Sequence, residues 1–168
     1  MRTVQKKICL LGAFAVGKTS LVRRYVEGIY NDQYLSTIGV KISHRTLTRP
    51  TGNIELFIWD LAGSDEFIRS ENSYLLGSAG ALIVCDLTRR DTLLVLERYI
   101  GQVHAVNANA RLVIVGNKAD LAEARKINQA ELNAICQSVG APPAVLTSAK
   151  TGENVEQAFT LLAEQLEV

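Results

Sequence analysis

A glycine-rich segment near the N-terminus has residue types and a spacing suited to binding phosphate. Gly12 to Thr19 reads Gly-Ala-Phe-Ala-Val-Gly-Lys-Thr and matches G-x-x-x-x-G-K-[ST] without a mismatch. Glycines let the backbone curl so that successive N–H groups face phosphate oxygens, and a following helix adds positive charge at its N-terminus. The nucleotide-binding residues expected here are Ala15, Val16, Gly17, Lys18, Thr19 and Ser20.

Two residues of this segment have predicted chemical roles. Lys18 is expected to reach the β- and γ-phosphates, and the Thr19 hydroxyl is expected to ligate Mg²⁺. The alternative is a glycine-rich turn with Lys18 merely exposed at the surface. The segment alone does not distinguish ATP from GTP.

A second set of polar residues favours guanine. Asn117, Lys118 and Asp120 directly follow an apolar run at 112–115. Guanine presents two adjacent donors, N1–H and the exocyclic amine, which one carboxylate accepts together, whereas adenine lacks that pair. Asp120 would therefore select GTP over ATP, and the Lys118 stem can lie along one face of the base. A backbone N–H of Ser148, Ala149 or Lys150 can donate to the guanine carbonyl oxygen. For Asn117 to Asp120 alone, the alternative is a polar loop or helix cap.

Short strand-like runs alternate with helical patterns along the chain. The expected strands are residues 7–11, 40–47, 53–59, 81–85, 112–115 and 144–146, the second and third forming a hairpin around Pro50-Thr51-Gly52. Helices are expected at 18–26 and 155–166. Another helix would be capped by Asp91 and would carry Leu94, Leu96, Tyr99, Ile100 and Val103. A fourth would begin at a capping box of Asn128 and Glu131. This alternation predicts an α/β fold with a mostly parallel sheet, whose ligand sits at the carboxyl ends of the strands.

The composition indicates one soluble globular domain over residues 1–168. The net charge is +1, which gives no reason to expect nucleic acid as a partner. Cys9, Cys85 and Cys136 lie far apart in apolar surroundings, so we expect buried, reduced thiols in a cytoplasmic protein. No apolar run approaches the roughly 20 residues that span a bilayer. The chain ends in Leu166-Glu167-Val168 without a cysteine, so we expect no lipidation site in it. We also expect a monomer.

The order of these motifs resembles the Ras superfamily, and most closely its Rab branch. The matching segments are Gly12 to Thr19, Tyr34 to Val40, Trp59 to Gly63, Asn117 to Asp120 and Ser148 to Lys150, with Ser36 to Val40 and the Trp59-Asp60 pair suggesting Rab. The resemblance implies a P-loop NTPase small G domain. Its sheet would have six strands, mostly parallel with one antiparallel edge strand, flanked by about five helices.

The resemblance also assigns roles to residues in two loops. Thr37 would coordinate Mg²⁺ and contact the γ-phosphate, Asp60 would hold Mg²⁺ through water, and the Gly63 N–H would bond the γ-phosphate. Tyr30 would pack on guanine and Tyr34 would close over the phosphates. Loss of the γ-phosphate would release both loops, which is how such proteins switch.

The same loops would form the surface that partner proteins read. Effector, exchange-factor and activator proteins are expected to bind around Thr37 and Gly63. The apolar residues expected on this surface are Ile38, Val40, Trp59, Phe67, Ile68 and Tyr74, each of which could equally be core.

Two residues depart from the family pattern and bear on GTP hydrolysis. The expected catalytic set is Lys18, Thr37, Gly63 and Ser64, but Ser64 stands where the family usually has a glutamine that orients water. Phe14 stands where a small residue is usual and would crowd an arginine finger, a group worth roughly 10³–10⁵ in rate. We therefore expect slow hydrolysis. The alternatives are a GTP-binding module with negligible hydrolysis, and an ATP-using P-loop enzyme.

Overall fold

The chain forms a six-stranded sheet in the order β2-β3-β1-β4-β5-β6. The computed structural model describes residues 2–31, 39–61 and 72–166. The strands are β1 (Thr3–Leu11), β2 (Val40–Arg49), β3 (Gly52–Leu61), β4 (Ser78–Asp86), β5 (Arg111–Asn117) and β6 (Val145–Leu146). β2 pairs with β3 in antiparallel fashion and every other neighbouring pair is parallel. This confirms the predicted mostly parallel sheet with an antiparallel edge strand.

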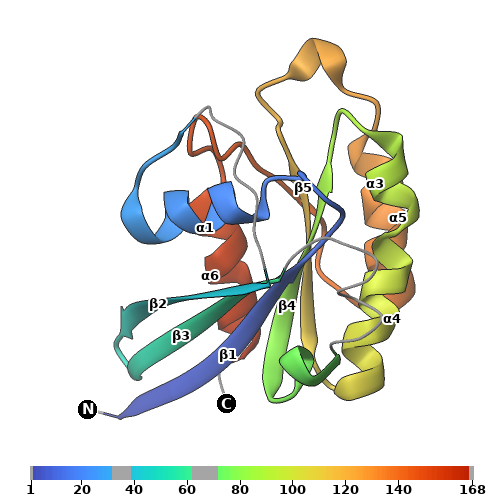
Figure 1. Cartoon of the computed structure of the whole chain (residues 1–168). Coiled ribbons are helices and arrows are strands. Elements are labelled where there is room, and N and C mark those ends of the chain that lie inside the picture. Colours follow the sequence, from blue (N-terminus) through green and yellow to red (C-terminus); the bar gives the residue numbers. More distant parts are fainter. Residues whose placement is uncertain (1, 32–38, 62–71, 167–168) are drawn as a thin grey trace.

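Helices cover both faces of the sheet (Figure 1). In the described part of the chain they are α1 (Lys18–Glu27), α3 (Arg90–Leu94), α4 (Leu96–Val106), α5 (Gln129–Val139) and α6 (Val155–Gln165), with 3₁₀ turns η1 (Asn72–Leu75) and η2 (Ala122–Ala124). α1 and α6 pack on one face, and α3, α4 and α5 pack on the other. None of the described helices combines the length and apolar composition needed to cross a membrane.

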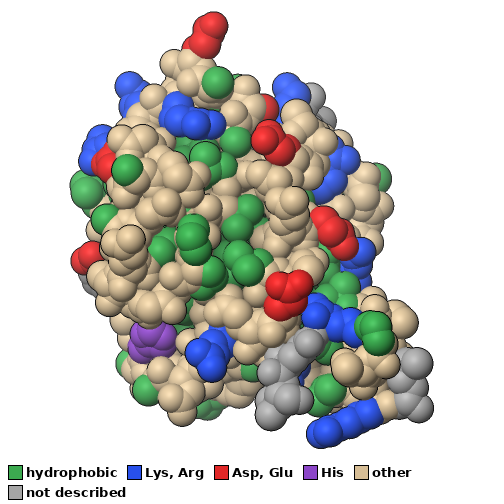
Figure 2. Space-filling model, turned by 180° about the vertical axis from the view of Figure 1, so that it is seen from behind, with side chains coloured by type: hydrophobic (Ala, Val, Ile, Leu, Met, Phe, Trp, Pro, Cys, Tyr) green, Lys and Arg blue, Asp and Glu red, His purple; other side chains and the backbone are tan. Residues whose placement is uncertain are grey.

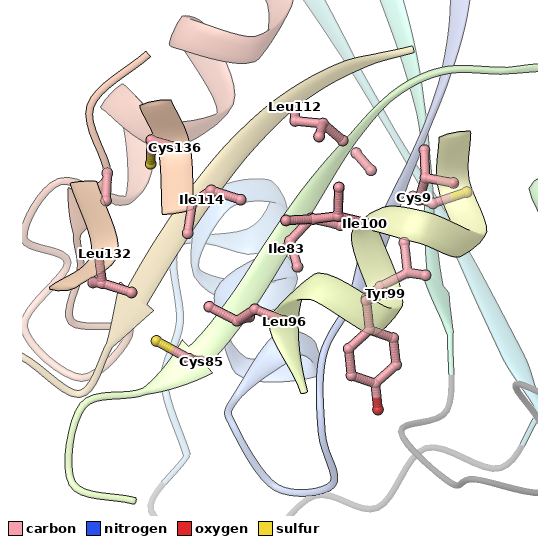
Figure 3. Packing of buried hydrophobic residues seen from close by; sticks show 14 of the residues in the cluster. Cys9, Ile83, Cys85, Leu96, Tyr99, Ile100, Leu112, Ile114, Leu132 and Cys136 are labelled. Atoms are coloured by element: carbon pink, nitrogen blue, oxygen red, sulfur yellow. The ribbon is translucent and has the colours of Figure 1, made fainter. Parts of the chain in front are cut away.

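Alternation along the strands divides the core into two layers. In β1, Ile8 and Leu10 face α1 and α6, whereas Cys9 and Leu11 face the other layer. Figure 3 shows this second layer, in which Ile83 and Ile114 of the sheet meet side chains of α4. All three cysteines are buried free thiols, as predicted.

The start of α3 differs from the prediction. Arg89, not Asp91, is the N-cap residue, and Asp91 lies in the first helical turn with its carboxylate 3.1 Å from the Arg89 guanidinium. The cause is Thr92, whose buried hydroxyl accepts from the Asp86 N–H at 2.9 Å and donates to the Arg89 carbonyl at 2.7 Å. The helical path is also interrupted at Val95.

The first apolar residue expected on this helix lies at the surface, since Leu94 is 74% exposed, whereas the preceding Leu93 is buried. The capping box of α5 is confirmed: the Asn128 side chain accepts from the Glu131 N–H at 2.9 Å, and the Glu131 carboxylate accepts from the Asn128 N–H at 3.3 Å.

Charged side chains of both signs are distributed around the rear face of the molecule (Figure 2). On this face a central group of hydrophobic side chains is surrounded by separate acidic and basic side chains, not by a continuous basic area. That distribution agrees with the net charge of +1.

Candidate functional site

Two glycines let the Gly12–Thr19 loop run against the carboxyl ends of the central strands. A Cβ added at Gly12 would lie 2.3 Å from the Val84 carbonyl oxygen of β4. A Cβ added at Gly17 would lie 2.3 Å from the Asn117 amide nitrogen, and Gly17 has a φ of 101°, which L side chains rarely adopt. Any larger residue at these positions would push the loop off the sheet.

The loop ends at the N-terminus of α1, which is suited to binding an anion. Gly17 is the N-cap residue and offers no side chain to the first-turn N–H groups, and the first turn has no acidic residue. These N–H groups therefore keep the partial positive charge of a helix N-terminus. A phosphate group can accept from them.

The loop carbonyls are held by donors from outside the loop backbone. Lys18 Nζ donates to the Gly12 and Ala13 carbonyls at 2.9 and 3.2 Å. The next three carbonyls, those of Phe14, Ala15 and Val16, accept from Arg89 at 2.8 Å, Lys118 at 3.2 Å and Asn117 at 3.0 Å. Because the C=O and N–H of a trans peptide point in opposite directions, this arrangement turns the loop N–H groups away from these donors.

Lys18 is a buried cation in this loop. Lys18 is only 6% exposed. Burial lowers the pKa of Lys18 to about 8, and the nearby Asp60 carboxylate opposes this shift. Burial of an ammonium group is unfavourable unless an anion lies near it. A bound phosphate would supply that charge.

Thr19 and Asp60 bring two oxygen donors together beside Lys18. The Thr19 hydroxyl donates to Asp60 Oδ2 at 2.5 Å, and Asp60 is 1% exposed at the end of β3. Hydroxyl and carboxylate oxygens are the ligands that Mg²⁺ prefers, and that ion keeps several waters. The pair therefore fits the predicted magnesium site. Thr37, the third predicted ligand, lies outside the described residues.

Asn117 joins the Gly12–Thr19 loop, called the phosphate loop below, to the segment that follows β6. Its amide nitrogen donates to the Val16 carbonyl, and its amide oxygen accepts from the Thr147 hydroxyl at 3.0 Å and from the Ala149 N–H at 3.4 Å. Asn117 is 2% exposed, so these bonds replace water that the amide would otherwise bind. The side chain thus fixes the distance between two loops that are far apart in the sequence.

Asp120 lies at the exposed edge of this junction. One of its carboxylate oxygens accepts from the buried Ser148 hydroxyl at 2.8 Å. The backbone of the Ser148–Lys150 segment is held from α1, because the Arg24 guanidinium donates to the Ala149 carbonyl at 2.9 Å and to that of Lys150. The Ser148 hydroxyl therefore orients the Asp120 carboxylate.

The structure brings together most of the predicted site residues. The Gly12–Thr19 loop, Asp60, Asn117 to Asp120 and Ser148 to Lys150 meet through the bonds above. Ser20 lies in the first turn of α1, and Tyr30 follows that helix and is 37% exposed. Tyr34, Thr37, Gly63 and Ser64 lie outside the described residues, as do Ile38, Phe67 and Ile68 of the predicted partner surface.

The other members of that partner surface are half-buried. Val40, Trp59 and Tyr74 pack against the core, and the rings of Trp59 and Tyr74 are 6.4 Å apart. The Lys7 ammonium lies 3.7 Å from the Trp59 ring centroid and donates to the Leu76 carbonyl at 2.8 Å. These residues belong in part to the core, which was the alternative raised for each of them.

Sequence reasoning missed four residues that contact the site, namely Thr147, Asp86, Arg24 and Arg89. Asp86 could have been found, because it follows the buried run 81–85 just as Asn117 follows the next strand. Arg24 and Arg89 carried no such signal, since they contact loop carbonyls far away in the sequence.

Comparisons with known proteins agree with this geometry. A profile of the Ras family matches residues 7–168. The GTP-binding protein YPTM1 of Zea mays is 36% identical over 158 residues, which cover 94% of this chain and 76% of that protein. The Ras-related protein Rab-19 of Xenopus laevis is 36% identical over 161 residues, covering 95% and 76% of the two chains. The Ras-related protein RIC1 of Oryza sativa subsp. japonica is 34% identical, with 95% and 79% covered. The chain has a glycine-rich loop after β1, a carboxylate after β5, a family match over residues 7–168 and relatives of this similarity, and it therefore belongs to the Ras family of small GTPases.

Proposed function

We propose that this chain binds GTP and GDP with Mg²⁺ at the site built around Asn117 and acts as a switch whose GTP hydrolysis is slow. The observation that carries the proposal is the bonding of one buried amide to both the phosphate loop and the segment after β6. A ligand that carries a phosphate tail and a base at one fixed separation would fit two segments held in this way. A nucleotide meets that requirement.

Asp120 supplies the preference for guanine. Its Oδ1 is held by Ser148, and a carboxylate in this position accepts both donors on the guanine edge. An adenine base would leave the carboxylate without these donors, and an unpaired charge is costly at a binding interface. The Lys118 stem would lie along one face of the base. Tyr30 would pack against its edge.

Lys18, Thr19 and Asp60 would hold the phosphates and the metal. Lys18 would neutralise the β- and γ-phosphates, and Mg²⁺ would be held by Thr19, Asp60 and Thr37. When bound, the ion would neutralise charge that develops on the phosphate oxygens. The loops of Thr37 and Gly63 would respond to the γ-phosphate, with Tyr34 closing over it, and effector, exchange-factor and activator proteins would read that response.

Ser64 and Phe14 support slow hydrolysis. A serine hydroxyl is too short to orient the water that the usual glutamine orients. Phe14 is 56% exposed, and its carbonyl is held by Arg89 within the phosphate loop. A bulky ring in this loop leaves less space for an activator's arginine. The same two residues favour the second candidate function, a GTP-binding module with negligible turnover.

The remaining features of the proposal concern the state of the protein in the cell. We propose a single small G domain over residues 1–168 that works as a cytoplasmic monomer. The three buried free thiols fit a reducing compartment.

Changing Asp120 tests the guanine preference. In Asp120→Asn the amide presents one acceptor and one donor, which suits xanthine better than guanine. We expect the preference for GDP over xanthosine diphosphate, measured from competition for a fluorescent nucleotide, to fall by about 100-fold or more, since two bonds to a charged group are lost. Glu123→Gln, on the exposed turn η2, is the matched control and should leave the preference unchanged. An unaltered preference in Asp120→Asn would rule out this role.

Changing Ser64 tests the explanation of slow hydrolysis. Ser64→Gln should raise the single-turnover rate of GTP hydrolysis by about tenfold or more, within the range that positioning and proton transfer contribute. Ser64→Ala should leave the rate as it is. The rate is measured as phosphate release from GTP-loaded protein. Loss of hydrolysis in Ser64→Ala would show that the serine itself acts in the reaction, and no measurable hydrolysis in wild type would favour the binding-module function.

Removing the buried charge of Lys18 should separate stability from binding. The folded pKa of about 8 is below the ordinary 10.5, so charged Lys18 destabilises the nucleotide-free fold below pH 8, and this cost disappears as pH rises towards 10.5. The stability of nucleotide-free wild type should therefore rise by up to about 3 kcal/mol between pH 8 and pH 10.5, and the Lys18→Met variant should lack this rise. Thermal unfolding with and without GDP measures this.

The same variant tests the contribution of Lys18 to nucleotide binding. GDP should raise the melting temperature of wild type but not that of Lys18→Met, because the variant cannot neutralise the phosphates. Lys126→Met removes an exposed lysine and serves as the matched control. A Lys18→Met variant that shows the same rise in stability with pH as wild type, or that keeps the stabilisation by GDP, would contradict the assignment.

A further inference from the structure

Asp86 is a buried carboxylate beside the nucleotide site that the proposed function does not use. It is the last residue of β4, it is 0% exposed, and it pairs in register with Asn117 of β5. A buried charge is unfavourable unless hydrogen bonds and an opposite charge compensate for it. The contacts of its two oxygens therefore indicate what it does.

The two oxygens of Asp86 have separate contacts. Oδ1 accepts from the Thr88 N–H at 2.9 Å and from the Thr88 hydroxyl at 2.7 Å, which shapes the turn after β4. Oδ2 is buried and accepts no well-aligned hydrogen bond from the described residues, but it lies 2.9 Å from Lys118 Nζ. The local turn thus engages one oxygen, and the other is left for the lysine.

Lys118 is constrained at both ends. Its backbone has a φ of 69°, in the left-handed region that few non-glycine residues adopt. Its ammonium group contacts Asp86 and also donates to the Ala15 carbonyl of the phosphate loop at 3.2 Å, while the side chain stays 35% exposed. The stem between these two ends is the segment expected to lie along the base.

We propose that Asp86 is a positioning residue for nucleotide retention, which acts by holding Lys118 so that its stem forms a fixed surface under the guanine base. This inference rests on the proposed function. A free lysine side chain has a large rotamer entropy, which would be lost on binding the base. The ion pair fixes the stem before the nucleotide arrives, and a preorganised contact slows dissociation.

The Asp86→Asn variant isolates the charge. Its amide oxygen, in the place of Oδ1, can still accept from Thr88. Its NH₂ group, in the place of Oδ2, is a donor and cannot accept from the lysine ammonium. The measured quantity is the rate at which GDP carrying a fluorescent ribose group leaves the protein in Mg²⁺ and excess unlabelled GDP. We expect dissociation about tenfold faster or more, the size of a lost hydrogen bond between charged groups. Glu97→Gln, an exposed carboxylate on α4, makes the same change in charge and should keep the wild-type rate.

A double-variant comparison separates positioning from a general effect on the fold. Lys118→Met should also speed dissociation, and adding Asp86→Asn to it should speed it no further, because Asp86 acts only through the lysine. The pair of changes should also restore melting temperature relative to Lys118→Met, since the buried carboxylate is no longer uncompensated. This comparison holds even if Asp86→Asn alone does not fold.

Two results would overturn the inference while leaving the proposed function intact. One is a wild-type dissociation rate in a folded Asp86→Asn variant. The other is an additive effect on the GDP dissociation rate. In that case Asp86→Asn would speed dissociation from Lys118→Met by the same factor as it does from wild type. Failure of the wild-type chain to bind GDP at all would instead overturn the proposed function, and this inference with it.

Discussion

The hydrogen bonds of the Asn117 side chain determine how the rest of the proposed site is arranged. One amide group contacts the phosphate loop at Val16 and the segment after β6 at Thr147 and Ala149. The missing Cβ at Gly17 is what allows this approach, since any side chain there would overlap the amide nitrogen. The parallel sheet makes the contact possible by ending β1, β4 and β5 at the same edge. The separation of the proposed phosphate and base positions is therefore a property of the fold.

The site contains groups whose burial or position favours a nearby anion. Lys18 is a nearly buried ammonium, and the N-terminus of α1 has no acidic residue in its first turn. Such groups favour an anionic ligand because binding compensates for their desolvation. Around them, Arg24, Arg89 and Lys118 hold backbone carbonyls of the two loops. Those contacts turn the loop N–H groups towards the proposed phosphate position.

Local patterns in the sequence predicted much of the fold and less of the site. The strand runs, the glycine-rich loop and the Asn128/Glu131 capping box depend on neighbouring residues, so they could be identified directly. Asp91 was wrongly expected to cap α3 because the buried hydroxyl of Thr92, which bonds to the end of β4, determines where that helix starts. Arg24 and Asp86 were missed because their partners, Ala149 and Lys118, are distant in the chain. The predicted roles of Thr37, Gly63 and Ser64 fall outside the described residues and stay predictions.

The identity of the nucleotide that copurifies with the chain tests the account most directly. The protein would be purified in Mg²⁺ without added nucleotide and denatured, and the released compounds would be separated by chromatography. The account predicts GDP or GTP at close to one molecule per chain, because a buried Lys18 and an oriented Asp120 retain both ends of a guanine nucleotide. A folded protein that releases ATP or ADP, or that releases no nucleotide and binds none when it is added, would contradict it.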